Sequence, residues 1–319
     1  MTNFTLASAN HTRVIVTVLR LSSVLYIAPF VLFAIFMYFL LWMLKVFFTT
    51  ADLRENSRYI LFAYVMANDT VYLFICCVLF ALTRCGYSIP TLACALLVGI
   101  TSATFSNTPS GLAAMAIERY IAICLPLRHA EICRADRCLI TVGVICCIGA
   151  LPYLIDCVIL SCSVQQNFFF QQVVCSREAL IVRTLQTVLR FAAHGTIFTV
   201  VTLVIVYTYI AIMLEAKKLN RDQASSSKAR KTVVLHSVQL LLCLTSFSFP
   251  ITEQHFQKDF TLKFFNMCIL MILPRCLSPL IYGLRDEAFQ KHMDICFSRP
   301  TRRTYLKACR VGMLKRYLC

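Results

Sequence analysis

Asp69 is a carboxylate in the middle of an apolar run, residues 59–82, and Asn68 stands directly before it. A charged group within a long apolar segment is costly to bury and usually serves a function. The two residues therefore predict an internal polar site or ion site. The alternative is an interhelical hydrogen bond that only fixes the packing. Asp156 lies near the outer end of another run, 138–159, within reach of the interface, so the structural reading is favoured for it.

The sequence contains no arrangement that is typical of an enzyme. It has no HExxH motif, no GxSxG motif and no paired aspartate motif within its apolar runs. Most of the 18 cysteines also lie in apolar runs, where a thiol behaves as a small buried hydrophobic group. We therefore expect no catalytic residue, no cofactor and no metal.

The elements that must position these residues are membrane-spanning helices. The 319 residues are 59% hydrophobic and 14% charged, whereas an average soluble domain has roughly 25% charged residues. Seven apolar runs reach the length of about 20 residues that a spanning helix needs. They are residues 22–45, 59–82, 89–124, 138–159, 185–214, 232–251 and 262–284. The sequence therefore predicts an all-α protein, a bundle of seven transmembrane helices.

The charges predict the orientation of this bundle. Most of the 31 Lys and Arg residues fall in alternate loops and in the segment after residue 284, which assigns those parts to the cytoplasm. The net charge of +16 is thus a topology signal that faces anionic lipid, and we expect no nucleic-acid partner. Residues 1–21 are expected outside, with Asn3 and Asn10 as glycosylation acceptors. Residues 22–284 form the helical domain, and 285–319 a basic cytoplasmic tail.

The inner end of the third run carries the string MAIERYIAICLPLRH, residues 115–129. This string closely resembles the M-A-x-D/E-R-Y-x-A-I-C-x-P-L-R-Y motif of vertebrate olfactory receptors, within the rhodopsin-like G-protein-coupled receptors. The resemblance continues at Asn68-Asp69, at residues 228–236 and at LSPLIYGLRD, residues 277–286. Glu118 replaces the usual Asp, and Ser278 replaces the Asn that normally precedes Pro279. Such departures are similar to those of the divergent, fish-type odorant receptors.

The resemblance implies roles for particular residues. Glu118, Arg119 and Tyr120, with Pro279 and Tyr282, would couple the bundle to a heterotrimeric G protein. Asp69 and Ser278 would form the internal polar or ion site. A small odorant would bind in the outer half of the bundle, among the third, fifth, sixth and seventh helices. The residues expected to face it come from the third, fifth and sixth runs. These are Thr101, Ser102, Phe105, Ser106, Phe191, His194, Phe247, Ser248 and Ile251.

Two further expectations concern cysteines. Cys94 lies 25 residues before Arg119, which is the spacing of the family's disulfide cysteine in the third helix. Its expected partner is Cys175, with Cys162 as the alternative. Cys296 follows an amphipathic stretch, residues 287–295, and is a candidate for palmitoylation.

The resemblance implies an odorant receptor in the plasma membrane, in the cilia of olfactory sensory neurons, that raises cAMP through its G protein. One alternative is a rhodopsin-like receptor for a peptide or another small ligand. A transporter with seven helices is an alternative of a different class. It would be expected to have internal repeats, and the sequence contains none that we can detect.

Overall fold

The computed structural model describes residues 30–218, 260–277 and eight positions between them: 238, 241, 242, 245, 246, 248, 249 and 252. Five helices in these parts are long and apolar enough to cross a membrane. They are Phe30–Thr49, α3 (Ser57–Arg84), α4 (Thr91–Cys124), α6 (Ala135–Ser163) and α7 (Thr184–Lys218). They confirm five of the predicted spans. A single segment that crosses lipid must be helical, because a helix forms all the hydrogen bonds of its backbone N–H and C=O groups within itself.

The last described segment is also helical. It consists of α10 (Phe260–Met267), a π-helical turn (Cys268–Ile272) and a continuation through residue 277. It occupies the described part of the seventh predicted run. In the sixth predicted run, the described positions are mostly helical.

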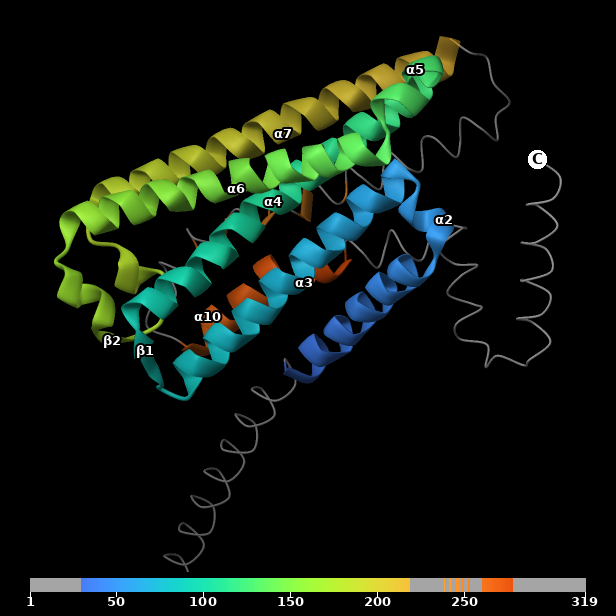
Figure 1. Ribbon diagram of the computed structural model, residues 1–319. Helices are drawn as coiled ribbons and strands as arrows, with labels where there is room; N and C mark the ends of the chain where they lie inside the picture. The colour runs from blue at the N-terminus through green and yellow to red at the C-terminus, as the bar shows by residue number, and fades with distance from the viewer. Residues whose placement is uncertain are drawn as a thin grey trace, which may run out of the picture.

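α4 is the central helix of the described bundle. It packs against α3, α6 and α7 (Figure 1). More of it is buried than of any other described span. Its contact with α6 is close because Gly99 lies against Tyr153 and Gly149 lies against Asn107, which leaves no room for a larger side chain at either glycine. Small residues allow helix backbones to approach each other in this way within a membrane.

Apolar side chains fill the interior and also cover the outer surface. Met43, Met66, Leu112 and Val201 belong to one buried cluster that joins four of the long helices. Many Leu, Ile and Val side chains of α6 and α7 remain exposed on the outside of the bundle. Continuous exposed apolar surface of this kind is expected where a helix faces lipid.

The two ends of the bundle differ. At one end β1 (Ser88–Pro90) pairs antiparallel with β2 (Gln172–Val174), with Ile89 opposite Val173. At the other end lie the short helices α2 (Ala51–Arg54) and α5 (Pro126–Ile132) (Figure 1). The sequence predicted neither strand. It also placed the start of the third span at Ile89, whereas α4 begins after Pro90.

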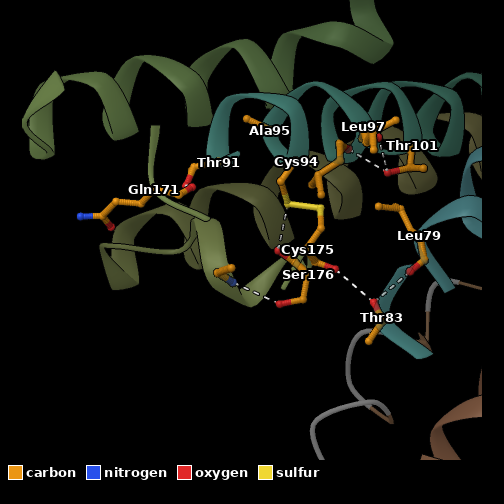
Figure 2. Close-up of a disulfide and its surroundings, with 12 residues drawn as sticks. Leu79, Thr83, Thr91, Cys94, Ala95, Leu97, Thr101, Gln171, Cys175 and Ser176 are labelled. Atoms are coloured by element: carbon orange, nitrogen blue, oxygen red, sulfur yellow. Dashed lines mark hydrogen bonds between the residues drawn. A yellow bond between two sulfur atoms is a disulfide. The ribbon is translucent and has the colours of Figure 1, made fainter. Parts of the chain in front are cut away.

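A disulfide joins Cys94, in the first turn of α4, to Cys175 in the loop between α6 and α7. Figure 2 shows it among the contacts that hold this loop. The backbone N–H and the hydroxyl of Thr91 donate to the carbonyl of Gln171, at 2.9 Å and 3.0 Å, and Thr83 Oγ1 donates to the carbonyl of Cys175 at 3.3 Å. The predicted pairing with Cys175 is confirmed, and Cys162 is a free, exposed thiol.

We expect Cys94→Ser to lower the free energy of unfolding by about 2 to 4 kcal/mol, because the disulfide restrains a long loop in the unfolded chain. Cys175→Ser should lower the free energy of unfolding by the same amount, and the double variant should lose no more than either single variant. Thermal unfolding of the purified protein measures all three. Cys162→Ser is the control and should leave stability unchanged; an equal loss in that variant would contradict the pairing.

Candidate functional site

Asp69 lies at the centre of a buried polar cluster. Its side chain is fully buried, and Arg275 of the last described helix reaches it across the bundle. Arg275 Nη1 lies 2.7 Å from Asp69 Oδ1, and the Thr108 hydroxyl of α4 donates to the same oxygen at 2.7 Å. A buried carboxylate is tolerated when it is paired and hydrogen-bonded in this manner. The cluster therefore joins α3, α4 and the last described helix.

Thr108 is the residue that connects the polar groups of this cluster. While its hydroxyl donates to Asp69, its oxygen accepts from Asn68 Nδ2 at 3.0 Å and from Arg275 Nη1 at 2.7 Å. A hydroxyl has one hydrogen to donate and two lone pairs, so all of its capacity is used. Asn68 Nδ2 also donates to the carbonyl of Thr104 at 2.9 Å. Asn68 thus fixes the spacing between α3 and α4.

Aromatic rings flank the guanidinium of Arg275. The guanidinium carbon lies 3.8 Å from the centre of the Tyr72 ring and 5.5 Å from that of Phe105. A guanidinium over a ring face is attracted by the ring's electron density. Beside it is a cavity of about 10 Å³, room for about one water molecule. Asp69, Thr108 and Arg275 contribute polar groups to its wall, and Phe105, Pro109, Phe198, Ser246 and Pro274 complete the lining.

Phe105 also belongs to a second cluster, nearer the β1–β2 end. Its ring centre lies 5.5 Å from that of His194 and 5.9 Å from that of Phe198, both on α7. The His194 side chain is buried, and its Nδ1 donates to the carbonyl of Arg190 at 2.8 Å. Nε2 is then the remaining polar atom, and it has no partner among the described residues.

The structure places the described members of the predicted ligand pocket as follows. Phe105, Ser102 and Ser106 are buried on α4, and Phe105 contacts His194. The Thr101 hydroxyl donates to its own helix, to the carbonyl of Val98 at 2.8 Å. Ser248 likewise donates to the carbonyl of Thr245, at 2.6 Å. Phe191 is partly buried.

Other predicted residues lie outside the described part of the chain. They are Asn3, Asn10, Phe247, Ile251, Ser278, Pro279, Tyr282 and Cys296.

Asp156 has the structural role that its sequence position favours, but it does not reach the interface. Its carboxylate is buried between α6 and α7, where Arg190 pairs with it. Arg190 Nε and Nη2 lie 2.8 Å and 2.6 Å from Asp156 Oδ2. The Arg190 side chain comes from the adjacent span, so the charge is neutralised within the bundle.

The third cluster lies at the α2–α5 end and contains Glu118, Arg119 and Tyr120. Glu118 is buried; Ser57 Oγ donates to its Oε1 at 3.4 Å, and His129 Nε2 lies 3.1 Å from the same atom. Arg119 Nε lies 3.8 Å from Glu118 Oε2. The Tyr120 ring packs against that of Tyr207 on α7, with centres 6.1 Å apart. Glu118 therefore joins α3 and α5 to α4.

The structure adds residues that the sequence analysis missed. Arg275, Phe198, Tyr72 and Thr108 belong to the clusters, yet none lies in a motif that we used. Arg275 had a detectable signal, because it is a charge deep within an apolar run and thus a natural partner for Asp69 in another run. The three apolar or hydroxyl residues carry no such signal.

Comparisons with known proteins agree with this architecture. Residues 41–282 match the family described as 7 transmembrane receptor (rhodopsin family). Odorant receptor 131-2 of Danio rerio is 30% identical over 248 residues, which cover 76% of each chain. Olfactory receptor 4K15 of Homo sapiens is 26% identical over 215 residues, covering 64% of this chain and 62% of the human protein. Olfactory receptor 52A1 of Homo sapiens is 28% identical over 209 residues, 60% of this chain and 64% of the other.

The family match extends over most of the chain and includes the Asp69, Arg119 and Arg275 clusters. It confirms the predicted bundle of seven helices, and it explains why no enzyme motif was found, since the family consists of receptors. The chain is a multi-pass membrane protein that belongs to the rhodopsin family of seven-transmembrane receptors and is related to odorant and olfactory receptors.

Proposed function

We propose that this receptor binds small odorant molecules in the outer half of its helix bundle and activates a heterotrimeric G protein that raises cAMP. The observation that carries the proposal is the likeness to the Danio rerio odorant receptor over 76% of both chains. The ring cluster of Phe105, His194 and Phe198 supports it, because it lies between the disulfide-bonded loop and the polar core.

The chemistry of this ring cluster suits a small amphiphile. Ligand pockets are mostly apolar, with a few polar groups that orient the ligand. Phe105 and Phe198 supply apolar surface, and Nε2 of His194 is a hydrogen-bond acceptor when Nδ1 carries the proton. Ser102 and Ser106, buried on the same helix as Phe105, add hydroxyl groups to this region.

The proposed orientation puts the β1–β2 end outside the cell. A disulfide persists in an oxidising compartment, and Cys94–Cys175 lies at this end. The opposite end carries Arg128, Arg134 and Arg137, as the excess of positive charge on cytoplasmic loops requires. This orientation implies an outside N-terminus and a cytoplasmic C-terminus. The proposed location is the plasma membrane and, as the family resemblance implies, the cilia of olfactory sensory neurons.

Activation in this proposal is a shift between two arrangements of the bundle. An agonist shifts the equilibrium only if it binds the active arrangement more tightly. In the described arrangement, Glu118 lies within 3.8 Å of Arg119 and is tied to Ser57 and His129. Pro109 within α4 and Pro274 in the last described helix are points where a helix bends readily. Movement there would release Arg119 toward the G protein.

We expect Arg119→Ala to abolish odorant-evoked cAMP while the amount of receptor at the cell surface stays the same, because Arg119 would contact the G protein. The measurement is a cAMP reporter screened against a panel of volatile and water-soluble odorants. Arg137→Ala, at an exposed arginine on the same face, is the matched control and should signal normally. A fully active Arg119→Ala receptor would refute the coupling role, and silence of the wild type to every odorant would refute the ligand class.

Phe105→Ala should raise the concentration of odorant needed for half-maximal response roughly 10- to 100-fold. A buried aromatic side chain contributes about 1.5 to 3 kcal/mol, and each 1.4 kcal/mol is a factor of about ten. Dose–response curves in the same reporter cells measure the shift. Phe74→Ala removes a ring of α3 that faces outward and should leave the curve in place. Equal shifts in both variants would place the ligand elsewhere.

A further inference from the structure

The Asp69 carboxylate requires a positive partner. Its side chain is 0% exposed and lies halfway along a membrane-spanning helix. A buried charge is stable only when a counter-charge and hydrogen bonds replace the lost water. In a membrane bundle that counter-charge can be a diffusible cation from the medium or a side chain of the protein. The two possibilities differ in how stability responds to the ions in the buffer.

In this chain the counter-charge is a side chain. Arg275 is 5% exposed, and its Nη1 lies 2.7 Å both from Asp69 Oδ1 and from Thr108 Oγ1. The guanidinium therefore already occupies the space in front of Oδ1, whereas Oδ2 of the same carboxylate has no hydrogen-bond partner among the described residues. Tyr72 and Phe105 hold the guanidinium from the sides through their ring faces. The guanidinium is thus fixed at the position where it neutralises the carboxylate.

The space beside the pair is small. The adjoining cavity of about 10 Å³ has room for about one water molecule. A sodium ion would need oxygen ligands on several sides, and a positive guanidinium in the same wall would repel it. Arg275 follows shortly after the π-helical turn Cys268–Ile272, and such turns often occur where a helix must direct a functional side chain.

We propose that Arg275 is the resident counter-ion of Asp69 and takes the place of a diffusible sodium ion at this site. The site therefore binds no sodium, and the link between α3 and the last described helix does not depend on the salt outside the cell. The inference concerns the bundle itself and holds whichever ligand the receptor binds.

The test is thermal unfolding of the purified, full-length receptor, without ligand, in sodium chloride and in N-methyl-D-glucamine chloride at equal ionic strength. We expect the wild-type unfolding temperature to be the same in both salts. Arg275→Met leaves Asp69 without its guanidinium, so sodium should raise its unfolding temperature by on the order of 3 °C in a saturable manner. The double variant Asp69→Asn/Arg275→Met has neither charge and should not respond to sodium. Arg137→Met, at an exposed arginine, is the matched control and should behave as wild type.

Two results would overturn the proposal. One is a saturable stabilisation of the wild type by sodium. The other is a folded Arg275→Met variant that is indifferent to sodium although Asp69 is retained. If Arg275→Met does not fold, the test uses Arg275→Lys and the wild type. The ammonium group of the lysine should replace the guanidinium, so sodium should not change the unfolding temperature of either protein. Since no ligand or G protein is used, failure of the odorant proposal would leave this test unaffected.

Discussion

The cost of burying charge in a low-dielectric bundle determines how the described helices are joined. Asp69 pairs with Arg275, Asp156 with Arg190, and Glu118 lies against Arg119 and His129. The first two pairs join different helices, and Glu118 is joined through Ser57 and His129 to segments beyond its own helix. Apolar packing alone gives little preference for one helix partner over another within lipid. These charged groups therefore specify which helices pack together and at which position along their length.

α4 connects four sites along the length of the bundle. It carries Cys94 at the disulfide, Phe105 at the ring cluster, Thr108 at the polar core and Glu118 at the opposite end. Phe105 contacts both His194 and the guanidinium of Arg275. In the proposed function, a ligand at His194 would act on the polar core through this one ring. Pro109, directly after Thr108, gives α4 a point of bending beside the core.

The spans could be predicted from the sequence itself, because a run of about 20 apolar residues has few alternatives to a spanning helix. The disulfide was expected from the family resemblance, which places a bonded cysteine 25 residues before Arg119, at Cys94. The two-stranded pairing of Ile89 with Val173 was missed because it depends on residues far apart in the chain. Such contacts leave no periodic pattern in either segment.

The candidate site was predicted less completely than the fold. Asp156 has a structural role, as expected, but its partner Arg190 was missed because the prediction treated one helix at a time and Arg190 comes from the next span. The role of Arg275 was missed for the same reason, although its charge is visible in the sequence. Phe198 and Tyr72 are ordinary aromatic residues of apolar runs, and only their positions in space distinguish them. A search for opposite charges in different spans would have found both ion pairs in the sequence. It would not have found the aromatic residues that contact them.

The ion pair between Asp69 and Arg275 is expected to hold the bundle together at its middle. A double-mutant cycle on the free energy of unfolding tests it most directly, using Asp69→Asn, Arg275→Met and the double variant. The double variant should be more stable than the sum of the two single losses implies, with a coupling energy of about 2 kcal/mol or more. Losses that add to within about 0.5 kcal/mol would contradict it.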